Sequence, residues 1–167
     1  MIHAFRGVSP KIHPRAFVVK SAEIIGDVAI GEDSSVWYNA VIRGDINSIQ
    51  IGMRTNIQDG CLLHVRHEYP LVVGSNVTAG HGAIIHACRI DDNALIGMGA
   101  IVLDNAHVKP YTIVAAGAVV RNDDQFDEGV LVAGVPAKVV RRLTDVERKM
   151  IDDSAQHYVE YAKIYQS

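Results

Sequence analysis

An aliphatic residue recurs every six positions through most of this chain, and this spacing constrains the fold more than any other feature. The period runs from Ile12 to Ile42, resumes over Ile51 to Leu63 and Val73 to Ile85, and continues from Ile90 to Val120. A helix needs a spacing near 3.6 and a simple strand alternates at two, so neither explains a period of six. The period predicts short strands separated by turns and stacked as a solenoid, in which each coil covers its neighbours.

A small residue stands four positions after most of these anchors. A large aliphatic residue pointing inward and a small residue at a tight corner suit a narrow triangular prism with three hexads to a coil. The pattern resembles the hexapeptide-repeat, left-handed parallel β-helix, a mainly β fold. Its left-handedness is implied by the resemblance, because general crossover rules favour the right-handed connection. The small residues are Ala16, Ala22, Ala40, Thr55, Cys61, Ala83, Ala94, Ala100, Ala106, Thr112 and Ala118.

The end of the chain follows a helical pattern instead. Thr144 and Glu147 form a predicted capping box, with Thr144 as the N-cap residue. Apolar residues then recur at helical spacing, which predicts one amphipathic α-helix over about 145–165 that lies back along the coils. We therefore expect a left-handed parallel β-helix over 1–142 and a C-terminal helix packed on the prism over 143–167. The predicted apolar stripe is Val146, Met150, Ala155, Val159 and Ala162.

Composition agrees with one domain that has a sizeable core. The chain has 167 residues, is 49% hydrophobic and carries a net charge of −3. The sequence has no stripe of Lys and Arg of the kind that would predict nucleic-acid binding. No apolar run is long enough to span a membrane. No secretory signal is recognised, and two cysteines do not make a disulfide framework, so we expect a cytoplasmic location. Cys61 stands at a corner position and is expected to be a buried, reduced thiol, although pairing with Cys88 is a second reading.

Two histidines share one phase of the repeat. Leu63 and Ile85 are 22 residues apart, which is one coil of 18 plus four residues of an inserted loop. Arg43, His64 and His86 each directly follow an anchor, so they should form a vertical ladder on one wall. Adjacent rungs lie about 4.8 Å apart, the spacing of neighbouring strands. Two imidazoles placed in this way can converge on one metal ion.

A third histidine, His81, has a different phase and belongs to the preceding wall, which also carries Gln58 and Asp59 one coil below. Within one prism it should not reach an ion held by His64 and His86. In a threefold assembly it would arrive from a neighbouring subunit. Three neutral imidazoles with an open fourth position are typical of catalytic zinc, which lowers the pKa of bound water to about 7. Iron(II) and cobalt are also accepted by such donors.

Several short motifs occur in a fixed order along the chain. They are Arg43-Gly44-Asp45, Ile51-Gly52, Thr55-Asn56-Ile57-Gln58-Asp59, His64, the run from Gly80 to Cys88, Gly97-Met98-Gly99-Ala100, the run from Gly134 to Lys138 and the helical tail. Together they resemble the γ-class carbonic anhydrase family over nearly the whole chain. The resemblance implies a homotrimer with zinc or another divalent ion at each subunit interface. The ligands it implies are His64 and His86 of one subunit and His81 of the next.

The resemblance also implies roles for the neighbours of these ligands. Gln58 would orient a metal-bound hydroxide that attacks CO2, and bicarbonate would then leave. Arg43 and Asp45 would form an ion pair near the metal, although an ordinary salt bridge between subunits explains these two residues equally well. Three further candidates would support or approach the site: Asn56, Asp59 and Tyr158.

Two departures from the family pattern concern proton transfer. The best-known archaeal member has a glutamate directly after the aspartate and a longer acidic loop before the second histidine. Here the first position is Ile46, which cannot carry a proton, and the loop is the short segment 65–71. Only His67 and Glu68 could act as a shuttle, which needs a mobile group with a pKa near the working pH. The chain thus resembles a short-loop branch of the family, for which the resemblance implies a metal site but not fast turnover.

The most direct interpretation is a trimeric, metal-dependent lyase that hydrates CO2 reversibly, with CO2 and bicarbonate as its small-molecule ligands. A hexapeptide acyltransferase or a zinc-dependent thioesterase acting on acyl-CoA is the first alternative. Three histidines at ligand phase, together with Asn56, Gln58 and Asp59, argue against the acyltransferase. The second alternative is a non-catalytic trimeric accessory protein that keeps a metal site.

Overall fold

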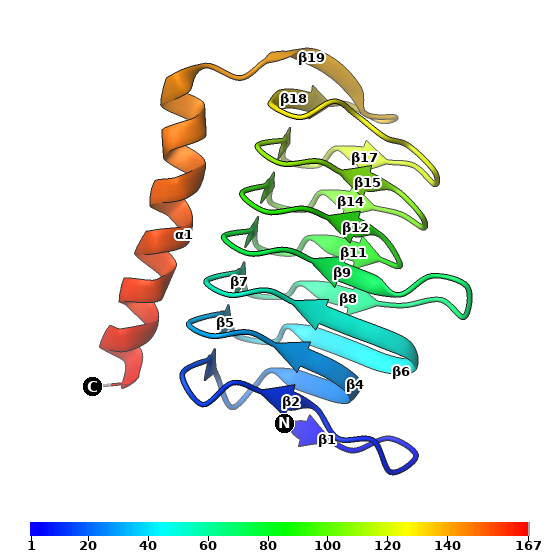
Figure 1. The fold of residues 1–167 in the computed structure, drawn as a ribbon, viewed down its shortest axis with the longest axis vertical. Coiled ribbons are helices and arrows are strands. Elements are labelled where there is room, and N and C mark those ends of the chain that lie inside the picture. Colours follow the sequence, from blue (N-terminus) through cyan, green and yellow to red (C-terminus); the bar gives the residue numbers. More distant parts are fainter. Residues whose placement is uncertain (167) are drawn as a thin grey trace.

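Short parallel strands wind upward around a prism in the computed structural model, which describes residues 1–166 (Figure 1). About seven turns are stacked, and one long helix runs beside them. One wall, here called the helix wall, is a separate sheet in which β19 (Lys138–Arg142) pairs antiparallel with the last parallel strand. Its parallel strands, in stacking order, are β3 (Phe17–Val18), β5 (Ser35–Val36), β7 (Asn56–Ile57), β10 (Thr78–Ala79), β13 (Leu95–Ile96), β16 (Ile113–Val114) and β18 (Val130–Ala133).

The other two walls form one larger sheet, because β4 (Glu23–Ile30) and β6 (Val41–Ile51) continue from one wall into the next. The ladder wall comprises the first half of β6 with β8 (Leu62–His64), β11 (Ile84–His86), β14 (Ile101–Val102) and β17 (Val119–Val120). The third wall comprises the second half of β6 with β2 (Lys11–Ile12), β9 (Leu71–Val73), β12 (Arg89–Ile90) and β15 (His107–Val108). A short β1 (Ile2–His3) pairs with β4.

The anchors of the six-residue repeat fill the interior, as the period predicts. Every anchor from Ile24 to Val120 is buried, and so are the small corner residues from Ala22 onward. Ile12 and Val18 are only partly buried because they lie in the first coil, which has no coil beneath it. Cys61 and Cys88 are buried free thiols, and burial raises the pKa of Cys61 to about 11. The reduced state expected for Cys61 is therefore confirmed.

Helix α1 (Asp145–Gln166) begins with the predicted capping box. The Thr144 N–H donates to Glu147 Oε2 over 2.9 Å, and the Glu147 N–H donates to Thr144 Oγ1 over 3.2 Å. The helix contacts β5, β7 and β10 of the helix wall. Within residues 1–166, no helix is long and apolar enough to cross a membrane. The last residue of the expected 143–167 segment, Ser167, lies outside the described residues.

The predicted apolar stripe of this helix is wrong in its first turn and a half. Val146 and Met150 are 79% and 46% exposed, whereas Ile151 is buried. Ala155, Val159 and Ala162 are buried as predicted. Ile151 precedes Ala155 by four residues and shares its face, whereas Met150 precedes it by five and points about 140° away. The stripe therefore begins at Ile151.

Aromatic contacts fix the far half of α1 on the lower coils. The rings of Tyr158 and Tyr165 lie 5.4 and 5.2 Å from that of Trp37, both edge to face. The indole N–H of Trp37 donates to Ser35 Oγ over 2.9 Å, so its polar edge is satisfied although the ring is buried. The helix thereby holds Tyr158 in a defined position beside the prism.

Truncating one anchor tests the role of the buried repeat. Ile57→Ala should lower the free energy of unfolding by about 2–5 kcal/mol, because it removes buried methyl groups and leaves a cavity. Val140→Ala, at a position that is 57% exposed, should change it by less than about 0.5 kcal/mol. Urea denaturation of both variants at one protein concentration gives the comparison. Equal effects would contradict the assignment of the anchors as the source of stability.

Candidate metal centre

The ladder expected from the spacing is present on the ladder wall. Arg43 pairs in register with His64, and His64 pairs in register with His86. Each residue follows a buried anchor, so its side chain points out of the prism. The two histidines are the last residues of β8 and β11, where the chain turns toward the third wall. Their imidazoles are thus brought together by stacking alone.

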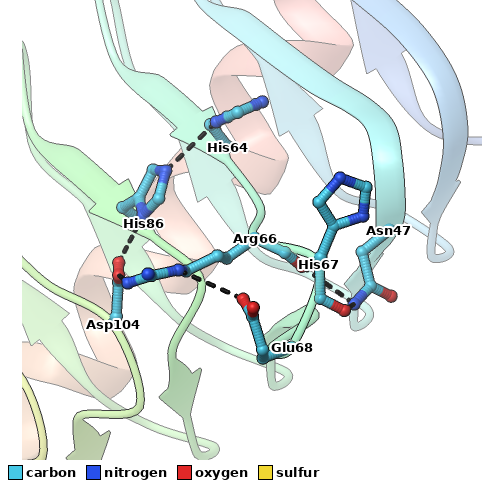
Figure 2. Close-up of polar contacts among 7 residues, drawn as sticks. All are labelled: Asn47, His64, Arg66, His67, Glu68, His86 and Asp104. Carbon is cyan, nitrogen blue, oxygen red and sulfur yellow. Dashed lines mark hydrogen bonds and ion pairs between the residues drawn. The ribbon is translucent and has the colours of Figure 1, made fainter.

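The two imidazoles face each other across a gap of the size a metal ion needs (Figure 2). Nδ1 of His64 lies 3.1 Å from Nε2 of His86. Two nitrogen ligands at about 2.0–2.1 Å from a tetrahedral zinc ion would be about 3.3 Å apart. The opposite ring nitrogens contact carboxylates: Nε2 of His64 lies 3.0 Å from Asp45, and Nδ1 of His86 contacts Asp104. Histidines that bind metals commonly make such a contact.

These carboxylates determine which ring nitrogens hold protons. A neutral imidazole has one N–H, and a carboxylate accepts it. With the protons on the sides of Asp45 and Asp104, the two facing nitrogens both carry lone pairs. Two lone pairs at this distance repel each other unless a shared proton or a metal ion lies between them. The donor set of this chain therefore fits a divalent metal ion.

Both carboxylates are themselves held by cations. Burial raises the pKa of Asp45, but hydrogen bonds from Arg43 and His64 outweigh it and keep that pKa below the usual value. Burial also raises the pKa of Asp104, and hydrogen bonds from His86 and Arg66 again outweigh it. Arg66 Nη1 lies 2.7 Å from Asp104. Both carboxylates are therefore anionic at neutral pH, and each accepts a hydrogen bond from the outer nitrogen of one imidazole.

Asp104 is the residue that the sequence analysis missed. It lies one coil above His86, two residues after the anchor Val102. The coil between Ile85 and Val102 has 17 residues rather than 18, so Leu103, and not Asp104, follows the anchor on the rung. Asp104 would have been found by looking for a carboxylate in the coil above each histidine and allowing that coil to be one residue shorter than 18.

His81 lies apart from these two histidines, at the corner between β10 and β11. Its Nδ1 is 2.7 Å from Asp59, one coil below, and its backbone N–H donates to Gln58 Oε1 over 3.2 Å. Within residues 1–166, no three His, Cys, Asp or Glu side chains form a group that could hold a metal ion. A single chain thus presents two imidazoles at one place and the third at another corner.

A chain of hydrogen bonds runs behind His81 through buried polar side chains. Gln58 Nε2 donates to Asn56 Oδ1 over 3.0 Å, and Asn56 Nδ2 donates to Thr78 Oγ1 over 2.9 Å. Thr78 Oγ1 in turn lies 3.0 Å from Ser154 Oγ on α1. The polarity is fixed at one end because the backbone N–H of His81 can only donate. Gln58 therefore presents its oxygen to His81 and its NH2 group to Asn56.

Tyr158 lies in the same pocket as Gln58 and His81. Burial and the nearby Asp59 carboxylate raise the pKa of the Tyr158 hydroxyl, so it stays protonated at neutral pH. The structure thus brings Tyr158, which the sequence analysis took only from the family resemblance, to the corner that carries His81.

The loop after His64 is fixed by Arg66 and Asn47 (Figure 2). Arg66 Nε is 3.1 Å from Glu68, and Asn47 Nδ2 donates to the carbonyls of Arg66 and His67 over 3.0 Å each. Glu68 points toward Arg66, whereas the His67 ring projects away from this ion pair. Of the two candidate proton shuttles, Glu68 is held by an ion pair, whereas the His67 side chain is not.

Comparison with known proteins agrees with this geometry. Residues 87–122 match a model described as bacterial transferase hexapeptide (six repeats). The chain is 44% identical to mitochondrial γ carbonic anhydrase 2 of Arabidopsis thaliana, over 95% of this chain and 59% of that protein. It is 40% identical to a carbonic anhydrase of Geobacillus kaustophilus, over 100% of this chain and 92% of that protein. A Bacillus cereus crystal structure, provisionally named an acetyltransferase, superposes with a TM-score of 0.97 at 42% identity, covering 98% and 95% of the chains.

The chain belongs to the γ-class carbonic anhydrase family, as its motifs indicated. Its fold is the family's parallel β-helix with one C-terminal helix. The chain spans 59% of the length of the plant relative but nearly all of the bacterial one.

Removing the Asp104 carboxylate tests its role behind His86. Asp104→Asn should weaken zinc binding about 10- to 100-fold, as is typical when the hydrogen-bond partner of a ligating histidine is lost. Asp91→Asn is the matched control, because Asp91 lies 2.6 Å from His107 on the third wall, away from the centre. Competition with a chromogenic chelator measures both affinities. Equal zinc affinities in the two variants would refute the role of Asp104.

Proposed function

We propose that the protein is a homotrimeric, metal-dependent carbonic anhydrase that converts CO2 and water reversibly into bicarbonate and a proton. The observation that carries this proposal is the pair of facing imidazole nitrogens of His64 and His86, 3.1 Å apart and each backed by a carboxylate. Such a pair needs a cation, and a catalytic zinc site needs one more protein ligand. His81 of a neighbouring subunit is that ligand in the proposal.

An apolar ladder beside the histidines supports the trimer. The residue before each anchor on the ladder wall also points outward and is apolar, giving a stack of five rungs. Leu62 is 45% exposed, and α1 covers the helix wall rather than this one. The other four rungs are partly exposed. A continuous, partly exposed apolar stack next to half a metal site favours burial against another copy, and a heterologous contact of this kind forms a ring when its rotation closes. The rungs are Val41, Leu62, Ile84, Ile101 and Val119.

The metal would be held by His64 and His86 of one subunit and His81 of the next. Zinc held in this way supplies a Lewis acid that lowers the pKa of bound water to about 7, and iron(II) or cobalt suits the same donors. The protein's own part is orientation. Asp45 and Asp104 keep the imidazole lone pairs aimed at one point, and Arg43 neutralises the charge of Asp45.

Gln58 would orient the reacting oxygen. Its carbonyl is committed to the N–H of His81 and one amide proton to Asn56. A primary amide has two N–H donors, so one remains for an oxygen of the substrate or the nucleophile. Asn56 holds this arrangement from behind, while Asp59 fixes the His81 ring. Tyr158 borders the same space from α1.

The proton would leave through His67. Glu68 is held by Arg66, while the His67 side chain makes no hydrogen bond to another described residue. The imidazole is a common proton-transfer group, and an exposed ring can pass a proton to solvent. Because Ile46 cannot assist, transfer through a single exposed imidazole is consistent with modest turnover.

Metal content and hydration measured on one preparation test the proposed function. The protein should hold about one divalent ion per chain and hydrate CO2 in a stopped-flow assay. His81→Ala should lose both properties, because one of three ligands is gone. His157→Ala, an exposed histidine on α1, should keep both.

Three results would overturn parts of this proposal. Full metal loading with no hydration above buffer would remove the enzymatic claim and favour an accessory protein with a metal site. Turnover of acetyl-CoA that survives removal of the metal by chelation would favour the acyltransferase, the activity for which the Bacillus cereus protein is provisionally named. Thioester hydrolysis lost on chelation would favour the metal-dependent thioesterase.

A further inference from the structure

A groove of about 440 Å³ opens between α1 and the upper part of the helix wall, with His81 and Gln58 at one end. Pockets that bind small organic ligands have volumes in this range and bury most of the surface of a drug-sized molecule. CO2 has three atoms and would leave most of the groove unfilled. The space next to the proposed metal site therefore exceeds what the proposed substrate requires.

The outward rungs of the helix wall explain why this groove is polar at one end only. Asn56 pairs in register with Thr78, Thr78 with Leu95, and Leu95 with Ile113. The rungs thus change from amide and hydroxyl to aliphatic just above Thr78. Leu95 and Ile113 both line the groove, and Met98 stands at its rim with 61% of its surface exposed.

Apart from the metal ion that His81 would bind, the polar end offers a hydrogen-bond donor and no full charge. None of the groove residues, taken from residues 1–166, is Asp, Glu, Lys or Arg. Gln58 has one amide proton beyond its bonds to Asn56 and His81. The matching ligand is uncharged, presents an acceptor oxygen at one end and carries an apolar tail. A carbonyl compound with a short acyl chain has this form.

We propose that the groove binds the acyl chain of an uncharged carbonyl compound, whose oxygen accepts the remaining Gln58 amide proton while its tail lies against Leu95 and Ile113. The inference rests on the proposed function, because Gln58 and His81 belong to the same site. It extends the ligands that this site would bind from CO2 alone to short-chain acyl compounds such as amides, esters or thioesters.

Calorimetric titration with two unreactive amides tests the groove. Hexanamide and acetamide share the carbonyl group and differ only in the apolar tail. Titrated into the intact protein, with and without added zinc, hexanamide should bind at least about tenfold more tightly, because each buried methylene adds affinity. Equal affinities, or no binding of hexanamide, would overturn the proposal.

A matched pair of substitutions locates the binding. Leu95→Trp should fill the groove and abolish the preference for hexanamide, whereas Leu131→Trp should leave it unchanged. Leu131 lies in the same outward ladder, one coil above Ile113, and does not line the groove. The same loss in both variants, each checked for native circular dichroism, would overturn the assignment.

The outcomes separate this inference from the proposed function. Hydration of CO2 without any preference for hexanamide would refute the proposed acyl-chain binding in the groove but not the proposed function. A preference for hexanamide that Leu95→Trp abolishes, in a protein that does not hydrate CO2, would refute the carbonic anhydrase activity and leave the groove assigned.

Discussion

The burial of one aliphatic side chain per six residues is the interaction on which the rest of the molecule depends. Each anchor packs on the anchors of the coils above and below, so the register between coils is fixed by the core. Residues next to an anchor must then point outward and stack on their counterparts one coil away. His64 and His86 meet for this reason alone, although 22 residues separate them. A slip of one residue would turn a rung from solvent to core.

The electrostatics of the centre follow from the same stacking. Asp45 and Asp104 lie beside the two histidines and accept hydrogen bonds from the far sides of the rings. Their own charge is balanced by Arg43 and Arg66. The result is a rigid pair of lone-pair donors built on strand ends, with a spacing suited to a metal ion. The third imidazole occupies a separate corner, so the site is divided between copies of the chain in the proposed assembly.

The sequence predicted the parts of this structure that depend on periodicity. The β-helix, the buried anchors and the ladder of Arg43, His64 and His86 follow from a constant spacing. Asp104 escaped prediction because a coil of 17 residues shifts it off the rung. The ion pair between Arg66 and Glu68 also escaped, because loop conformation depends on contacts with Asn47 and Asp104 that no repeat encodes.

The C-terminal helix α1 also has one part that the sequence predicted and one that it did not. Its start was predictable, because Thr144 and Glu147 interact locally. Its buried face was not, because the choice of Ile151 over Met150 depends on how the helix lies against the wall. The groove beside Gln58 depends on the same placement. Periodicity therefore determines where the proposed metal ligands lie, while tertiary packing determines the space around them.

Subunit mixing tests the division of the metal site between subunits most directly. His81→Ala and His64→Ala proteins should each fail to bind zinc tightly. If they are unfolded together in equal amounts and refolded, roughly a quarter of the sites should pair an intact ladder with an intact His81 from its neighbour. About that fraction of the normal zinc content should return. A mixture that recovers no zinc, although it assembles normally, would contradict a site shared between subunits.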